Sequence, residues 1–307
     1  MEDRTAYFEA LAAQARGNNH LQPGCFNRFG VKHGLRNEDG SGVLVGLTTV
    51  SAVFGYETVA GQFNPQEGRL YYRGLNLEEI VQRFEDEDRF GFEDTAFLLL
   101  FGAFPSPEER TRFKETLGEM RPLPPHFARD ALQTCPTPNI MNGLARFILT
   151  LYSVDVDPEN LAFENQVRQA MEVVARMPTL VPYAYHVIRY NRNNESLVFH
   201  KPDPSLSSAE NFLRLLRKDG EYSELEARTL DMSLVLHGDH GGGNNSTFTT
   251  RVVSSTLTDI YSSISAAIGS LKGLLHGGAN GRVVDMMEDL KKQLGATPDR
   301  AGVRGYL

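Results

Sequence analysis

The chain has 307 residues, 41% of them hydrophobic and 23% charged, a composition typical of globular proteins that bury a substantial core. Its 31 basic and 39 acidic residues leave a net charge of −8, which argues against a nucleic-acid partner held by charge alone. The N-terminus has no apolar signal segment, and the most apolar stretch, 260–275, is too short and serine-rich to span a bilayer. We therefore expect a cytoplasmic protein with no membrane partner.

The first quarter of the chain predicts one short helix and a small β element. Residues 4–16 have helical character and end in Gly-Asn-Asn. A turn rich in glycine and aspartate then leads into the apolar run 43–48, which predicts a short strand, and a second strand is predicted at 69–73, before Gly74. The sequence thus places a short β element within residues 43–73.

Helical patterns dominate from residue 77 onward. The run 77–84 is amphipathic and 92–101 is strongly apolar. A serine followed three residues later by glutamate, the pattern of a capping box, predicts helix starts at Ser106, Ser207 and Ser223. Further helices are predicted at 139–153, 161–176 and 179–192, bounded by Pro138, Pro158 and Pro178. We predict a mainly α fold with a small β element near the N-terminus.

The segment 247–275 is rich in serine, alanine and glycine, and we expect a helix with little side-chain bulk. Such a surface lets another helix approach closely. Two compatible interpretations stay open at this point. The helix is either buried at the centre of the fold or packed against its partner in a dimer.

Two histidines frame the sequence His237-Gly238-Asp239-His240. A metal site built on His237, Asp239 and His240 is one hypothesis, but no H-x-H, H-E-x-x-H or cysteine pair accompanies the pattern, so we expect no metal. For His237 the simpler interpretation is a ring satisfied by a backbone carbonyl at the end of a helix over 223–236. His240 is followed by a glycine turn, 241–243, and by Asn244. That turn predicts either a backbone nest for a small carboxylate or a plain connection between helices.

His276 follows a helix and precedes Gly277-Gly278-Ala279-Asn280, so we expect it where a turn leads into a new helix. The partial positive charge of a helix N-terminus can keep such a ring neutral, and a neutral ring can donate a hydrogen bond to a developing enolate. The alternative is a histidine that only caps a turn.

Taken together, residues 237–280 closely resemble the citrate synthase family, and the resemblance extends to 31–48, 68–80 and 92–109. The turn Gly-Gly-Gly-Asn-Asn is similar to that of a bacterial subgroup, where other citrate synthases usually carry glutamate at the position of Gly241. The resemblance implies a homodimer whose large helical domain spans 1–280, including an N-terminal arm and the β element, and whose small domain starts at 281–307.

The implied reaction is an acyl transfer that condenses acetyl-CoA with oxaloacetate to citrate and CoA, with acetyl-CoA as co-substrate and no further cofactor. By motif position, His276 would bind the thioester carbonyl and stabilise the enol, and His240 and Asn244 would hold oxaloacetate. The border of the acetyl-CoA pocket would be formed by Leu275, Gly277, Gly278, Ala279 and Asn280. Two alternatives stay open: a 2-methylcitrate synthase that uses propionyl-CoA, and a non-catalytic dimerisation or ligand-binding remnant.

The resemblance stops after Asn280. A later histidine that polarises oxaloacetate, the aspartate that takes the methyl proton and the carboxylate-binding arginines have no counterpart there. The acidic side chains of Asp285, Glu288 and Asp289 fit the solvated face of a helix over 281–294, and 297–307 predicts the start of another helix. We interpret the chain as truncated at its C-terminus. Alone, it should show little synthase activity, an exposed apolar surface and poor solubility.

Overall fold

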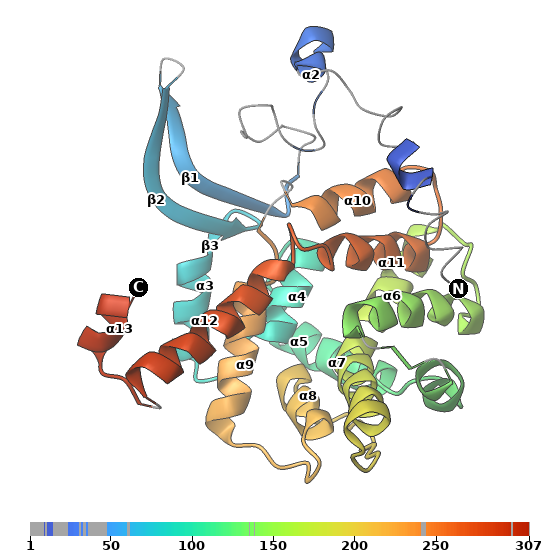
Figure 1. Cartoon of the computed structure of the whole chain (residues 1–307). Helices are drawn as coiled ribbons and strands as arrows, with labels where there is room; N and C mark the ends of the chain where they lie inside the picture. The colour runs from blue at the N-terminus through green and yellow to red at the C-terminus, as the bar shows by residue number, and fades with distance from the viewer. Residues whose placement is uncertain are drawn as a thin grey trace. The chain divides into compact units, whose positions relative to one another are not determined.

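The computed structural model describes residues 9, 11–14, 24–30, 32, 35, 48–59, 62–134, 136, 137, 139–240, 244–295 and 297–306. The chain divides into two units, Met1–Val45 and Gly46–Leu307. In the first unit, residues 9 and 11–14 are helical, as predicted for 4–16, and a short helix, α2, spans Cys25–Phe29. The other described elements belong to the second unit (Figure 1).

Three antiparallel strands open the second unit: β1 (Ser51–Val59), β2 (Gln62–Tyr72) and β3 (Leu75–Asn76), in the order β1-β2-β3. Figure 1 shows β1 and β2 as a long hairpin beside the helices. The strand predicted at 69–73 is confirmed as the end of β2, which is much longer than predicted. Of the strand predicted at 43–48, residues 43–47 lie outside the described residues, and Thr48 is not in a strand.

The prediction misses β1. Its β-branched and aromatic residues are typical of a strand, but they do not alternate with polar ones. The neighbours Val53 and Phe54 are 55% and 54% exposed, so side chains on both faces of the hairpin reach solvent. Gly55 interrupts the pattern, and the pairing register shifts there, between Phe54 and Tyr56. Because neither face of the strand is buried, apolar and polar residues do not alternate along its sequence.

Helices make up most of the second unit, which confirms the mainly α fold. At Ser106, Ser207 and Ser223 both hydrogen bonds of a capping box are present, as predicted. Among the described helices, none combines the length and the apolar character needed to cross a bilayer. In chain order the helical elements are α3 (Leu77–Asp86), α4 (Phe92–Phe101), α5 (Pro107–Met120), the π-helix η1 (Ala128–Gln133), α6 (Ile140–Leu151), the 3₁₀ helix η2 (Tyr152–Val154), α7 (Phe163–Asn193), α8 (Ser208–Leu216), α9 (Glu224–Leu236), α10 (Asn245–Ser254), α11 (Ile260–Leu271), α12 (Gly278–Leu294) and α13 (Arg300–Tyr306).

Helix α7 runs through Pro178 and Pro182, so the prediction of two helices separated at Pro178 is wrong. A proline inside a helix removes a backbone hydrogen bond and costs about 3 kcal/mol. Packing against α5, α6 and α8 offsets this cost. Beyond Pro178, Leu180 and Val187 are both buried in the main core. Tertiary burial therefore overrides the local preference.

The small-residue segment forms two helices, α10 and α11, and the prediction of a single helix is wrong. Leu257 adopts a left-handed backbone conformation (φ 62°) between them, and the Asp259 side chain caps α11. The two helices pack against each other, and α11 also packs on α6. Tyr261 and Ile268 of α11 are buried. By contrast, none of the ten residues of α10, all of which the structure describes, is buried.

Two hydrophobic clusters position the elements that matter for the site. The larger one joins η1, α6, α7, α8 and α11. The second joins the end of β2 to α3, α4 and α9 through Tyr72, Leu77, Ile80, Phe84, Leu98 and Val235. Since Val235 lies in the last turn of α9, this second cluster holds the end of the helix from which the candidate site begins.

The last two helices agree with the predicted helical character of 281–294 and 297–307, although α12 already begins at Gly278. Tyr306 of α13 donates a hydrogen bond to the Asp289 carboxylate of α12 at 2.9 Å. Asp285 and Glu288 are exposed, as expected for a solvated face. The domain boundary at 280 and 281 stays a prediction.

Candidate active site

The site begins where α9 ends. The His237 ring donates through Nδ1 to the Ser233 carbonyl oxygen at 2.7 Å, so the interpretation of this histidine as a helix-end cap is confirmed. The backbone N–H of His237 bonds to the same carbonyl at 3.1 Å. His237 is thereby engaged with its own helix.

His240 and Asn244 lie side by side across the glycine turn. The Asn244 side-chain nitrogen Nδ2 lies 3.2 Å from His240 Nε2. Asn244 also caps α10, because its Oδ1 accepts from the Thr247 N–H at 2.9 Å. That bond makes Nδ2 the atom that faces His240, so His240 Nε2 accepts and its proton is on Nδ1. The turn residues 241–243 themselves lie outside the described residues.

Ser246 joins this pair to His276. Its hydroxyl donates to Asn244 Oδ1 at 2.7 Å and lies 3.0 Å from His276 Nε2. We call the four side chains His240, Asn244, Ser246 and His276 the polar row. The row connects the end of α9 with the turn between α11 and α12, and it contains three of the predicted site residues. Sequence reasoning missed Ser246, although its position in the first turn of α10 beside the capping Asn244 was a usable signal.

The turn that carries His276 needs glycine. The His276 N–H bonds to the Gly273 carbonyl oxygen at 3.0 Å, and the Gly277 N–H bonds to the Leu271 carbonyl oxygen at 2.9 Å. A Cβ on Gly277 would lie 2.2 Å from that Leu271 oxygen, which no side chain permits. Because α12 starts at Gly278 with Gly277 as its N-cap, His276 lies just before a helix start, as predicted.

The remaining predicted residues flank His276. Leu275 is fully exposed, and Gly277 and Gly278 are partly buried at the start of α12. Ala279 and Asn280 lie in the first turn of α12, and their side chains are outside the described residues. In the row itself His240 is exposed, whereas Asn244, Ser246 and His276 are half-buried, so the row is open to a ligand on the His240 side.

The two histidines of the metal hypothesis contact other groups. Among the residues that the structure describes, no group of three or more His, Cys, Asp or Glu side chains could bind a metal ion. His237 is turned to its own helix, and the partner of His240 is an amide.

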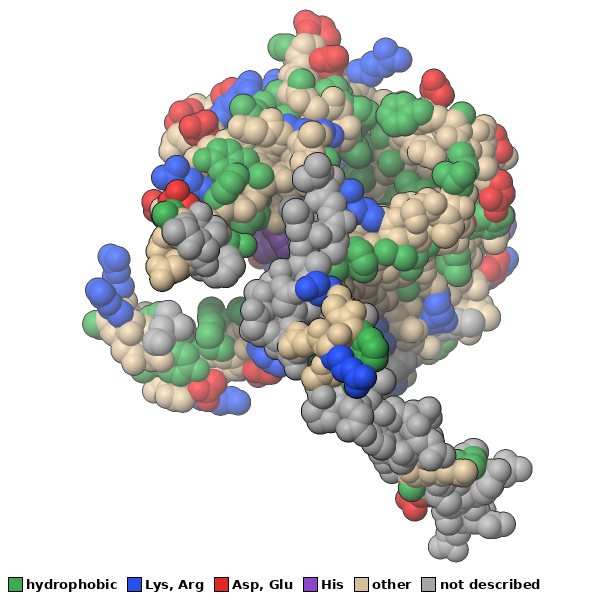
Figure 2. Space-filling view, turned by 90° about the horizontal axis from the view of Figure 1, so that it is seen from above, with side chains coloured by type: hydrophobic (Ala, Val, Ile, Leu, Met, Phe, Trp, Pro, Cys, Tyr) green, Lys and Arg blue, Asp and Glu red, His purple; other side chains and the backbone are tan. Residues whose placement is uncertain are grey.

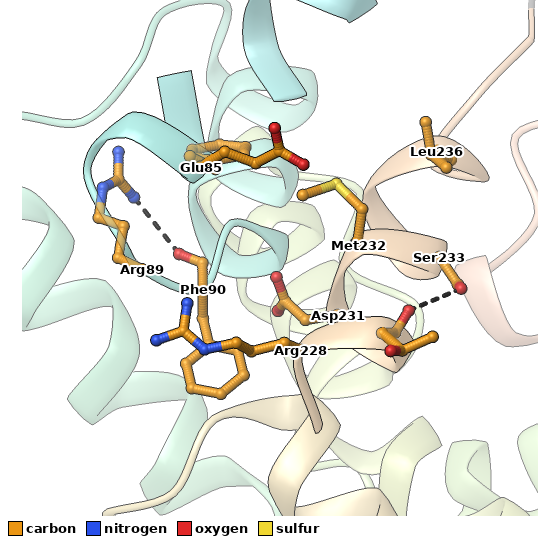
Figure 3. A pocket seen from close by; sticks show the side chains of 10 residues that line it. Glu85, Arg89, Phe90, Arg228, Asp231, Met232, Ser233 and Leu236 are labelled. Atoms are coloured by element: carbon orange, nitrogen blue, oxygen red, sulfur yellow. Dashed lines mark hydrogen bonds between the residues drawn. The ribbon is translucent and has the colours of Figure 1, made fainter. Parts of the chain in front are cut away.

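A cavity of about 440 Å³ lies between α3 and α9, beside the turns of α9 that lead to His237 (Figure 3). The Asp231 carboxylate on this face of α9 is buried and accepts from the Gly91 N–H at 2.6 Å and the Phe92 N–H at 3.2 Å. Burial raises the pKa of Asp231 to about 6, although both backbone donors favour its charged form. Since both oxygens cap the start of α4, this carboxylate ties α9 to α4.

Comparison with known proteins identifies the family. The family model "Citrate synthase, C-terminal domain" matches residues 40–304. The chain belongs to the citrate synthase family. It is 34% identical over 265 residues to the citrate synthase of Haloferax volcanii, covering 85% of this chain and 62% of that protein. It is 29% identical over 240 residues to the 2-methylcitrate synthase of Shewanella oneidensis, covering 78% of this chain and 60% of that protein.

Solved structures agree with this membership. The citrate synthase of Pyrobaculum aerophilum superposes with a TM-score of 0.68 at 28% identity, covering 85% of this chain and 61% of that one. A ternary complex of carboxymethyl coenzyme A and oxaloacetate with the citrate synthase of Thermoplasma acidophilum gives a TM-score of 0.67 at 25% identity, covering 86% and 61%. The chain therefore spans about three fifths of the length of the citrate synthase relatives described here.

Proposed function

We propose that this chain forms the oxaloacetate-binding and enol-stabilising part of a citrate synthase-type site. The observation that supports this most is the polar row, which links two histidines from distant segments by hydrogen bonds. Family membership supplies the reaction class, acyl transfer. The Thermoplasma acidophilum enzyme, which has been solved with oxaloacetate and a CoA analogue, supports the choice of ligands.

Oxaloacetate would bind at the exposed side of the row. His240 offers its Nδ1–H, and the Asn244 amide offers Nδ2–H, so each can donate to a carboxylate oxygen of the ligand. Asn244 Nδ2 has two hydrogens, so one can bond the ligand while the other bonds His240 Nε2 and Oδ1 still caps α10.

Ser246 is placed to select which nitrogen of His276 carries the proton. While the serine proton points to Asn244 Oδ1, the serine oxygen accepts from His276 Nε2. If the serine proton instead points to Nε2, the neutral His276 ring carries its single proton on Nδ1, from which it can donate elsewhere. That donor would then bond the thioester carbonyl oxygen of acetyl-CoA, and a well-placed donor of this kind lowers the barrier by about 3 kcal/mol.

In the proposed reaction a base takes a proton from the acetyl methyl group, and the resulting carbon attacks the carbonyl carbon of oxaloacetate. Hydrolysis of the thioester then releases CoA. None of the polar row residues is a carboxylate, and Asp289 of α12 is engaged with Tyr306 and Gln293. We therefore expect residues 1–307 alone to bind oxaloacetate but to release CoA slowly.

We also propose a homodimer in which α10 is covered by a second copy, and a reaction that needs no cofactor besides the acyl-CoA. The absence of buried residues in α10, whose whole length the structure describes, supports the dimer. The cytoplasmic location expected from the sequence stays a prediction.

Oxaloacetate binding tests the proposal directly. In calorimetry on the purified chain, His240→Ala and Asn244→Ala should each weaken oxaloacetate binding about tenfold or more, the loss expected when a charge-assisted hydrogen bond is removed. His200→Ala is the matched control, because the His200 ring instead bonds to the Arg217 and Lys218 carbonyls at 3.1 Å. Equal affinity in the wild type and the two row variants would overturn the proposal.

The 29% identity with a 2-methylcitrate synthase supports propionyl-CoA as an alternative acyl donor. After oxaloacetate has been added, titration with acetyl-CoA and with propionyl-CoA distinguishes the two. Tighter binding of propionyl-CoA would favour the methylcitrate reaction over the citrate reaction.

A further inference from the structure

Tyr72, at the end of β2, is fully buried beneath the end of α9. Its hydroxyl donates to the Val235 carbonyl oxygen at 2.9 Å and lies 3.3 Å from the Leu236 carbonyl oxygen. The phenol oxygen of Tyr72 also accepts a hydrogen bond from the backbone N–H of Asp239 at 3.2 Å. One phenol oxygen thus bonds both to the last turn of α9 and to the residue that precedes His240.

These are backbone groups that a helix cannot satisfy by itself. The last carbonyls of a helix have no partner within it, and a buried group left without a partner costs free energy. Burial raises the pKa of the Tyr72 phenol, so at neutral pH it keeps the proton that it donates to Val235. A phenylalanine would fill the same space in the core but would lose both hydrogen bonds of the phenol, leaving the Val235 carbonyl oxygen with the Gly238 N–H, 3.3 Å away.

The turn at Gly238 lies against the phenol. A Cβ at this position would lie 3.4 Å from the Tyr72 oxygen, an ordinary contact, and 3.1 Å from Leu99 Cδ1, which is tighter than most side-chain contacts. Because His240 follows Asp239 directly, the direction of the bond from Asp239 to Tyr72 constrains where the His240 ring can lie.

We propose that Tyr72 is a positioning residue for His240, which its hydroxyl orients through the backbone of Asp239. The role of His240 in binding oxaloacetate is taken from the proposed function. The hydroxyl acts through the turn 237–240 and does not touch the ligand.

The test compares Tyr72→Phe with Tyr183→Phe. Tyr183 is also buried, and its hydroxyl also donates to a backbone carbonyl, that of His200 at 2.6 Å, in the larger core. Tyr183→Phe loses one donated hydrogen bond, and Tyr72→Phe loses one donated and one accepted bond, so both variants should melt at lower temperatures than the wild type. Only Tyr72→Phe should weaken oxaloacetate binding, by about tenfold, the usual effect of one misplaced hydrogen-bonding group. Equal affinity of the two variants would overturn the proposal.

A second measurement does not depend on oxaloacetate. In NMR spectra of the ligand-free protein, Tyr72→Phe should shift the His240 ring signals and speed exchange of the Asp239 amide hydrogen, and Tyr183→Phe should change neither. If the wild type fails to bind oxaloacetate, the proposed function fails, and these spectra still decide the role of Tyr72. Unchanged His240 and Asp239 signals in Tyr72→Phe would overturn it.

Discussion

Single residues decide how protons are shared in the polar row. Ser246 has one proton and two neighbours that can accept it, Asn244 Oδ1 and His276 Nε2. The sequence pattern indicated both histidines and Asn244, because glycines and asparagines cluster around them. Ser246 was missed because a serine in the first turn of a helix is common. Its position beside the capping Asn244 was a signal, but its link to His276 is visible only in the 3.0 Å distance to Nε2.

The charge of Asp231 depends on the fold. Burial raises its pKa to about 6 from a reference value of 3.8, so the folded state binds a proton more tightly than the unfolded chain does. The contribution of this group to stability is therefore fully present below about pH 4 and declines as pH rises through 6. Its carboxylate must still cap α4 when charged, through Gly91 and Phe92.

We expect Asp231→Asn to reduce the pH dependence of the free energy of unfolding. Between pH 5 and pH 7 the free energy of unfolding of the wild type should fall by about 1 kcal/mol more than that of the variant, because only the wild type loses a proton from this buried site. Urea unfolding at both pH values measures the difference. Asp88→Asn, which alters an exposed carboxylate paired with Arg228, is the control and should keep the wild-type slope. Parallel slopes for all three proteins would contradict the raised pKa.

Among the elements, a clip formed by Asp155, Arg168 and Tyr261 joins the residue after η2 to α7 and α11. The Asp155 side chain, 0% exposed, lies 2.7 Å from the Arg168 guanidinium of α7 and accepts from the Tyr261 hydroxyl of α11. Burial alone would raise the pKa of Asp155, but the bonds from Arg168 and Tyr261 outweigh it and hold the pKa at about 2. The clip fixes the start of α11, the helix that leads to His276.

Asp155→Asn should destabilise the protein by about 1 to 2 kcal/mol at pH 7, a range lowered from the full pKa shift because Arg168 is 27% exposed. A depressed pKa stabilises the folded state above about pH 4 and loses this effect as pH falls toward 2. The difference in free energy of unfolding between the variant and the wild type, measured by urea unfolding, should therefore be smaller at pH 3 than at pH 7. Asp157→Asn, on the exposed part of the same loop, is the control. A gap that stays constant with pH would contradict the assignment.

The sequence predicted helix starts correctly where a side chain bonds to the backbone of its own helix. The capping boxes at Ser106, Ser207 and Ser223 were readable because serine and glutamate bond to the backbone within one turn. The break expected at Pro178 failed because the core contacts of α7 lie far away in sequence. The break at Leu257 was missed for a similar reason, since packing of α10 on α11 and of α11 on α6 bends the chain there.

At the scale of the whole molecule, exposed hydrophobic side chains suggest that the chain has partners. Hydrophobic side chains reach the surface at many places on the face shown in Figure 2. Val252 of α10 is 50% exposed, and Leu257, just beyond it, is 74% exposed. Apolar surface of this kind usually marks contacts with other chains or segments.

The proposed homodimer predicts a mass of twice 34.2 kDa in analytical ultracentrifugation at micromolar concentration. Val252→Asp places a charge on α10 and should shift the protein toward monomer, because burying an unpaired charge in an interface is costly. Val156→Asp adds the same charge at a loop valine that is 89% exposed, and it should leave the mass unchanged. A monomeric wild type, or equal effects of the two variants, would argue against a dimer through α10.

The sequence by itself determined the family, the mainly α class, the capped helix starts and three residues of the polar row. These properties depend on residue types and on spacings within a turn or a short motif. Only the tertiary structure decided that α7 is continuous, that β1 and β2 form a long hairpin, and that Ser246, Tyr72 and Asp231 bear on the site. The continuity of α7 and the roles of Ser246, Tyr72 and Asp231 depend on contacts between residues distant in the chain, such as the bond from Tyr72 to the end of α9. The hairpin pairs residues that are near in the chain, but its strands lack the alternation that would predict them. Local sequence patterns do not predict contacts between distant residues, because the free energy that stabilises them comes from tertiary packing.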